Sequence, residues 1–159
     1  MLSAQPQLSP WPEAEHYKLL TDYQIDTSAG PVTIPRHFHY DGASVPALAW
    51  QITYDPFHPD VMAPALVHDW LYYTHHIGTQ VISREQADDI LDDLFRRNGV
   101  GSTKRRIMTM AVKAAGGAVW ANDPEDKSVL REIYAALIAE GLSDAQILQR
   151  YGLNQAMTH

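Results

Sequence analysis

A short segment of the sequence combines histidine, aspartate and tyrosine at helical spacing. In "PALVHDWLYYTHH", residues 64–76, His68 directly precedes Asp69, and Tyr72 follows about one helical turn later. On a helix with about 100° per residue these three side chains share one side, while the other side carries Ala63, Val67, Trp70, Leu71 and Thr74. The segment therefore predicts a helix with a second, polar side whose residue types suit acid–base chemistry.

The next predicted helix supplies a carboxylate for this polar side. On the same helical wheel Asp88 lies at the edge of the apolar stripe, and the solvent side carries Asp89, Asp92 and Asp93. A carboxylate that holds one imidazole nitrogen fixes the tautomer of the ring and stabilises the cation formed on proton uptake. We therefore predict a general base made of His68 and Asp88, with Asp92, one turn further along, as the alternative carboxylate.

A second carboxylate, that of Asp69, leaves the first helix beside His68. Hard oxygen ligands of this kind suit calcium when a loop adds another carboxylate and backbone carbonyls. The segment "YDGAS", which contains Asp41 and Gly42, is a loop sequence that can supply both. The pattern therefore predicts a calcium site formed by Asp69, Asp41 and Gly42.

The elements that must position these residues begin with a strand region. Three prolines within residues 1–12 predict an extended arm or a lead-in to a strand, because proline fixes φ and removes a donor. The stretches 16–26 and 32–40 predict two antiparallel strands around the turn "TSAGP", with Pro35 demoting the second to an edge or bulge. Residues 41–60 form a predicted loop region, and the His-Asp helix is expected to begin near Val61 with Pro64 in its first turn.

Helices account for the rest of the chain. Ser83 and Gln86 form a capping box, and apolar residues then recur at helical spacing until Asn98 and Gly99 end the run. Further helices are expected at 102–120, 123–141 and 143–152. The prediction is one α+β domain over residues 1–159, mainly helical, with an extended arm at 1–12, strands at 15–40, a loop region at 41–60 and helices at 61–159. The His-Asp helix and the Asp88 helix are expected to lie antiparallel.

Composition excludes several classes of protein. A net charge of −7 argues against non-specific binding of nucleic acid, and the absence of cysteine removes disulfide and thiol chemistry. The N-terminal residues lack the pattern of a signal peptide, and no apolar run approaches the roughly 20 residues of a membrane span. The sequence alone therefore indicates a chain without a signal peptide or a transmembrane segment.

The motifs "DGASVP", "ALVHDWLY", "SREQADDI" and "MAVKAAGGAVW" follow one another within residues 30–120. In this order they resemble an uncharacterised phage and prophage family, domain-of-unknown-function family 1353. That resemblance implies a phage protein located in the host cytoplasm or associated with the virion, where phage structural proteins are expected partners.

A looser resemblance is to the active-site helices of phospholipase A2, in which an Asp-Gly-x-Ser loop precedes a His-Asp-x-x-Tyr helix and then a helix with an aspartate. It implies a phospholipase A2-like two-helix core and calcium-dependent hydrolysis of a phospholipid or another ester. His68 would activate water, Tyr72 would hydrogen-bond the Asp88 carboxylate, and Asp69, Asp41 and Gly42 would serve the metal. Cysteines that often flank the site in the secreted enzymes are absent here, with Ala43 and Leu71 in their places.

A structural role competes with this prediction. Histidine and aspartate in a helix also form hydrogen-bonded pairs that only satisfy buried polar groups. Under that hypothesis the chain is a non-enzymatic virion, tail or assembly protein that retains the scaffold. His75 and His76 at the helix end are expected to complement the helix dipole and are not assigned a catalytic role.

Overall fold

The computed structural model describes residues 3–11, 16–36, 38–40, 58–120 and 146. Apart from residue 146, the predicted helices at 123–141 and 143–152 lie outside these residues, as does almost all of the predicted loop region. The described strands are β1 (Leu8–Trp11), β2 (His16–Leu19), β3 (Tyr23–Thr27), β4 (Gly30–Ile34), β5 (His39–Tyr40), β6 (His76–Ile77) and β7 (Gln80–Val81). The described helices are α2 (Pro59–Thr74), α3 (Arg84–Arg97) and α4 (Ser102–Trp120). The predicted α+β class with mainly helical content is confirmed for this part of the chain.

The strands form three small antiparallel sheets. β3 and β4 make a hairpin around the predicted turn, with Thr27 paired to Gly30. β2 pairs with both β1 and β5, while β6 and β7 form a short ribbon between α2 and α3. The prediction of two strands was therefore correct for the hairpin but incomplete, since each predicted stretch is divided between two sheets.

The division of the two stretches has a local cause. Pro35 follows the end of β4, and its carbonyl accepts a hydrogen bond from the Phe38 amide at 3.2 Å, which turns the chain. The Asp22 carboxylate accepts from the Arg36 amide at 2.9 Å, which joins the bend before β3 to the bend after β4. The predicted arm also contains β1, an edge strand that tolerates Pro10 because a missing donor matters least at an edge.

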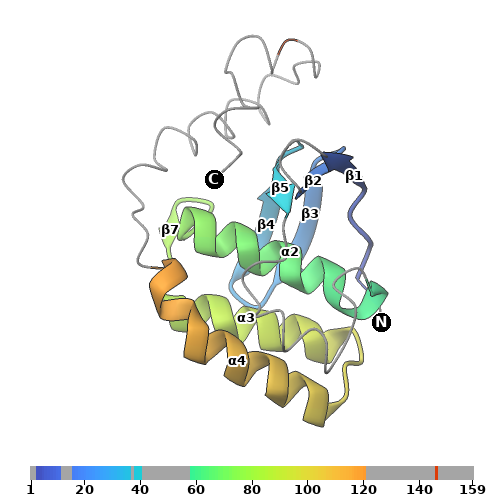
Figure 1. The fold of residues 1–159 in the computed structure, drawn as a ribbon. Coiled ribbons are helices and arrows are strands. Elements are labelled where there is room, and N and C mark those ends of the chain that lie inside the picture. The colour runs from blue at the N-terminus through green and yellow to red at the C-terminus, as the bar shows by residue number, and fades with distance from the viewer. Residues whose placement is uncertain (1–2, 12–15, 37, 41–57, 121–145, 147–159) are drawn as a thin grey trace.

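The helices stack beside the strands, and α2 lies in the middle of the arrangement (Figure 1). α2 contacts α3, α4 and β4, and it runs in the opposite direction to α3, as predicted. The core contains the fully buried side chains of Leu19, Ile34, Leu66, Leu71, Leu91, Leu94, Phe95 and Met108. Because α2 packs against helices on one side and a strand on another, both of its predicted sides are largely buried.

Helix boundaries follow from capping groups. The Ser83 side chain accepts from the Gln86 amide at 3.1 Å, and the Gln86 side chain accepts from the Ser83 amide at 2.8 Å, which confirms the capping box of α3. α2 begins earlier than predicted, at Pro59, after His58 as its N-cap. Pro64 therefore lies inside the helix and not in its first turn, which corrects the prediction.

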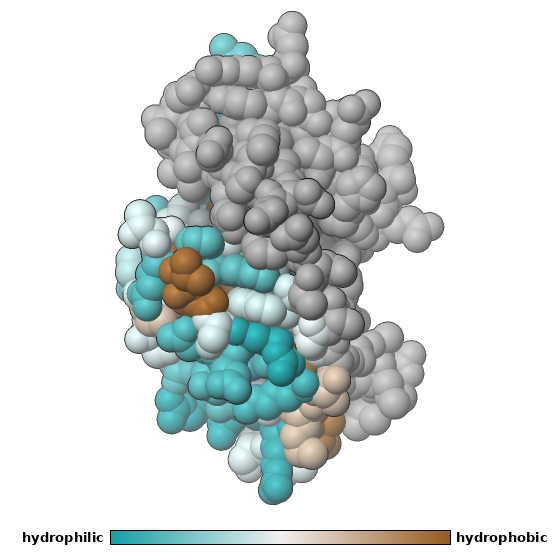
Figure 2. Space-filling view, turned by 90° about the vertical axis from the view of Figure 1, so that its left-hand side faces the viewer, coloured by the Kyte–Doolittle hydropathy of each residue, from teal (hydrophilic) through white to brown (hydrophobic). Residues whose placement is uncertain are grey.

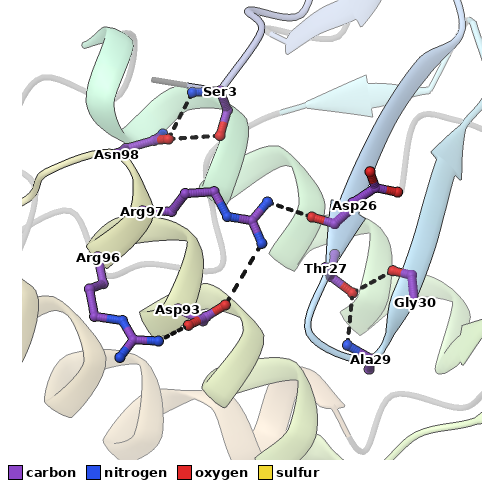
Figure 3. A network of polar contacts seen from close by, with 9 residues as sticks. All are labelled: Ser3, Asp26, Thr27, Ala29, Gly30, Asp93, Arg96, Arg97 and Asn98. Carbon is purple, nitrogen blue, oxygen red and sulfur yellow. Dashed lines mark hydrogen bonds and ion pairs between the residues drawn. The ribbon is translucent and has the colours of Figure 1, made fainter. Parts of the chain in front are cut away.

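An interior proline leaves the carbonyl four residues earlier without its usual helical donor. In α2 that carbonyl belongs to Asp60, and it accepts from the Asn98 side-chain amide at 3.0 Å. The side-chain oxygen of Asn98, Oδ1, in turn accepts hydrogen bonds from the Ser3 amide at 2.9 Å and the Ser3 hydroxyl at 2.7 Å (Figure 3). One side chain at the end of α3 thus compensates for Pro64 and fixes the N-terminal segment.

Two further contacts join the N-terminal segment to the hairpin and the hairpin to the helices. The Tyr23 hydroxyl donates to the Ala4 carbonyl at 2.7 Å, and burial raises the pKa of Tyr23 to about 12. The Arg97 guanidinium donates to the Asp26 carbonyl at 2.6 Å, which joins the end of α3 to β3 (Figure 3). The β3–β4 hairpin is thereby fastened to the helical layer.

In the part of the chain that the structure describes, few large apolar side chains are exposed. Leu20, Val81, Ile107 and Met110 are the exposed ones among the described residues. On the side of the molecule drawn in Figure 2, hydrophilic residues dominate the coloured surface, and hydrophobic ones form small, separate patches. In the described part of the chain, no helix combines the length and apolar character that crossing a membrane requires.

We predict that Asn98→Ala lowers the free energy of unfolding by about 2 kcal/mol, because the Ser3 donors and the Asp60 carbonyl lose a buried partner. Urea denaturation followed by circular dichroism measures this change. Ser3→Ala, which removes only one of the three hydrogen bonds, should cost less.

The link to the proline is tested by a double-mutant cycle. Pro64→Ala restores a backbone donor for Asp60, so this substitution should be more favourable in the Asn98→Ala protein than in the wild type. Strictly additive changes in unfolding free energy would contradict the compensation.

Candidate functional site

Three buried side chains meet where α2 crosses α3. His68 and Tyr72 lie one turn apart on α2, and Asp88 lies in the second turn of α3. Their exposed fractions are 0% for His68, 3% for Tyr72 and 2% for Asp88. The structure therefore brings together the three residues that the sequence predicts as a catalytic set.

Both partners bind the same carboxylate oxygen. The Nε2 atom of His68 lies 2.8 Å from the Asp88 Oδ1 atom, and the Tyr72 hydroxyl donates to that atom at 2.6 Å. The His68 and Tyr72 rings also touch, with centroids 4.1 Å apart. Hydrogen bonds to an ionised acceptor are short and strong, and a buried carboxylate requires such partners because burial removes its water.

The position of the carboxylate decides which nitrogen of His68 can act. An ionised carboxylate only accepts hydrogen bonds, so the neutral ring carries its proton on Nε2 and its lone pair on Nδ1. Nδ1 is buried and has no hydrogen-bond partner among the described residues. A basic nitrogen oriented by a carboxylate on its far side is thus present.

Burial shifts the pKa values of His68 and Tyr72 in opposite directions. It lowers the pKa of His68, and the hydrogen bond and charge of Asp88 oppose this effect without cancelling it. Burial raises the pKa of Tyr72, and the hydrogen bond to Asp88 raises it further. At neutral pH the imidazole is therefore neutral and able to accept a proton, while the phenol remains a hydrogen-bond donor.

The alternative carboxylate, Asp92, is engaged elsewhere. Its Oδ1 atom lies 3.0 Å from the Arg105 Nε atom of α4. Asp93 forms ion pairs with Arg96 and with Arg97. Asp88 is therefore the partner of His68, as the position of Asp88 beside the apolar stripe predicts.

The predicted metal ligands are only partly described. Asp69 follows His68 on α2 and is partly buried, whereas Asp41 and Gly42 lie outside the described residues. Within the described ranges, no three His, Cys, Asp or Glu side chains are grouped in a way that could hold a metal ion. The calcium site stays a prediction.

Two residues of α4 that the sequence does not predict as site residues also belong to the site, and the first is Trp120. Trp120, at the end of α4, packs edge-on against Tyr72 with ring centroids 5.1 Å apart. It also stacks on His75, with centroids 3.7 Å apart and ring planes 4° apart. His75 lies at the helix end, as the sequence predicts, where it is the C-cap of α2 with a left-handed φ of 56°, and its side chain is buried. His76 belongs to β6.

Gly116 is the second addition, and a sequence signal for it existed. A methyl group at this position would overlap the Tyr72 hydroxyl and lie 3.2 Å from its Cζ atom. Glycine weakens a helix interior, so the adjacent Gly116 and Gly117 within a predicted helix indicate a close approach by another group. The sequence does not reveal that this group is Tyr72.

The described fold and site define an α+β protein in which a His–Asp–Tyr cluster is buried between two antiparallel helices. Residues 17–112, more than half of the chain, match the model of a family described as protein of unknown function DUF1353. The chain belongs to this family. Neither the search of curated proteins nor the search of solved structures found a match.

The lowered pKa of His68 makes stability depend on pH. In the unfolded chain His68 titrates near 6.5, so below this pH the unfolded state binds a proton that the folded state resists. His68 alone should therefore reduce the unfolding free energy, by at most about 1.4 kcal/mol per pH unit, as the pH falls below this value. Urea denaturation between about pH 7.5 and 5.5 measures the slope.

The matched variants for this measurement are His68→Gln and His58→Asn. The first should flatten the pH dependence, while the second changes a partly exposed N-cap histidine and should leave most of the slope in place. An unchanged slope in His68→Gln would show that another group causes the pH dependence.

Proposed function

We propose that this protein is a calcium-dependent hydrolase of lipid esters, with a phospholipase A2-like site in which His68 activates a water molecule. One observation carries the proposal. His68 is held by Asp88 through Nε2 at 2.8 Å, and its Nδ1 atom has no hydrogen-bond partner among the described residues. The activated water, and not a side chain, would attack the ester carbonyl.

The cluster has the properties that a general base requires. Proton uptake on Nδ1 produces an imidazolium ion that the Asp88 carboxylate stabilises directly. The Tyr72 hydrogen bond holds the same carboxylate oxygen, so the carboxylate keeps its orientation as His68 changes charge. The lowered pKa of His68 keeps the base unprotonated at neutral pH.

Calcium enters the proposal through the chemistry of Asp69. Its carboxylate is a hard oxygen donor on the residue adjacent to the base, and calcium takes ligands of this kind. Asp41 and Gly42 are proposed to complete the set with a carboxylate and a carbonyl. When bound, the ion would supply Lewis-acid polarisation of the ester carbonyl.

The biological setting is proposed from the motifs alone. Their resemblance to phage and prophage sequences supports a protein that acts in the host cytoplasm or on the virion. The substrate class, a phospholipid or another ester, is proposed from the second resemblance, because the pattern of His68, Asp69, Tyr72 and Asp88 resembles that of the phospholipase helices.

A specific observation favours a second candidate, a non-enzymatic virion, tail or assembly protein. The His68 side chain has no exposed area in the structure, and a buried neutral histidine that satisfies a buried carboxylate needs no catalytic role. Under this hypothesis the cluster only joins α2 to α3.

Fatty-acid release from mixed phospholipid vesicles distinguishes the two candidates. With millimolar calcium the wild type should release fatty acid, a chelator should abolish release, and His68→Ala should lower the rate by at least about 100-fold. His58→Asn is the matched control, because it replaces the N-cap histidine of the same helix by a residue type that caps helices well.

Folding of His68→Ala must be verified by circular dichroism in the same experiment. Undiminished release by folded His68→Ala would refute the proposed base. No release from either protein would favour the structural candidate.

Calcium binding is tested independently of turnover. At a free concentration ten times the dissociation constant, calcium should stabilise the fold by about 1.4 kcal/mol, which corresponds to a rise in melting temperature of about 4 °C. The rise should disappear in Asp69→Asn and persist in Asp89→Asn, a matched change on the exposed side of α3. Equal shifts in both variants would remove Asp69 from the metal site.

A further inference from the structure

Two adjacent glycines of α4 face two groups of the neighbouring helices. If Gly116 carried a methyl group, that group would overlap the Tyr72 hydroxyl. A methyl group on Gly117 would lie 3.9 Å from the Arg84 guanidinium nitrogen Nη1. The phenol of α2 and the guanidinium of α3 therefore approach the same short stretch of α4.

Arg84 is fixed in this place by the backbone of α4. Its Nη1 atom donates to the Lys113 carbonyl at 3.2 Å. From here the positive charge of Arg84 opposes the rise in the pKa of Tyr72. The guanidinium of Arg84 and the hydroxyl that binds Asp88 thus lie at adjacent positions of α4.

The location of Arg84 in its own helix is unfavourable. Arg84 is the first residue of α3, where the positive end of the helix dipole disfavours a cation. Ser83 and Gln86 form the capping box of this helix start, and a guanidinium has no acceptor for the free amides of the first turn. A cation at this position is consistent with a role in the contact with Tyr72.

We propose that Gly116 and Gly117 seat the Tyr72 hydroxyl and the Arg84 guanidinium side by side, and that Arg84 is a positioning residue that holds Tyr72 on Asp88. Because a guanidinium only donates, it would face a lone pair of the phenol oxygen and leave the phenol proton for Asp88. Tyr72 is thereby restricted to the orientation that fixes the carboxylate. That this orientation serves a reaction at His68 rests on the proposed function.

The orientation of the Tyr72 hydroxyl is measured without any assay of activity. In protein labelled at the tyrosine Cζ atom with carbon-13, each of the 8 tyrosines gives a signal that depends on the hydrogen bonds of its hydroxyl. Tyr72→Phe assigns the signal of Tyr72. Arg84→Gln should shift that signal, and Arg84→Lys should return it part of the way toward its wild-type position.

Matched controls separate this effect from general disturbance of α3 and α4. Arg96→Gln removes an exposed arginine from the same helix and should leave the Tyr72 signal in place. Gly116→Ala should shift the signal because it fills the seat, whereas Gly101→Ala should not, since open space surrounds that position. An unshifted Tyr72 signal in Arg84→Gln would overturn the proposal.

The catalytic consequence is measured by hydrolysis of the same vesicles. Arg84→Gln should lower kcat by about 10-fold to 100-fold with little change in KM, because a misplaced carboxylate affects the base and not substrate binding. A shifted signal with unchanged kcat in an active enzyme would overturn the role of Arg84 in the reaction. A shifted signal in a protein whose wild type is inactive would confirm the seat and refute the proposed function.

Discussion

A carboxylate at the centre of the helical layer is the constraint on which the packing depends. Asp88 is 2% exposed, and an ionised group so deeply buried is tolerated only when hydrogen-bond donors replace its water. His68 and Tyr72 supply these donors from α2, so α2 and α3 must meet at a fixed rotation and register. Removing either donor would leave a charge partly unsatisfied, which costs more than the loss of an exposed pair.

The same constraint extends to α4. Tyr72 reaches the carboxylate only because Gly116 leaves room for its hydroxyl, and Trp120 covers the ring edge-on. A glycine inside a helix weakens that helix, so the close approach is obtained at a local cost in stability. The cluster therefore involves residues of all three described helices. It fixes the position of α4 as well as the contact between α2 and α3.

A comparable compensation operates at the other end of α2. Pro64 removes a backbone donor from the helix, and the Asn98 side chain replaces it at the Asp60 carbonyl. Asn98 also accepts hydrogen bonds from Ser3. One set of hydrogen bonds therefore joins three places: the beginning of the described chain, the start of α2 and the end of α3. This set and the Asp88 cluster together hold α2 near both of its ends, which makes α2 a rigid support for His68.

Local rules in the sequence determined the capping box of α3, the extent of α4, the hairpin turn before Gly30, and the choice of His68 and Asp88 as partners. The first three depend on residues a few positions apart, where helical or strand periodicity fixes the geometry. The pairing of His68 with Asp88 follows from the periodicity within each of the two helices, which places both residues on the sides that face each other. Tertiary structure alone decided the pairing of β1 with β2, the interior position of Pro64 and the burial of His75. These features depend on groups distant in the sequence, whose approach is set by packing of the whole domain, and so local periodicity contains no information about them.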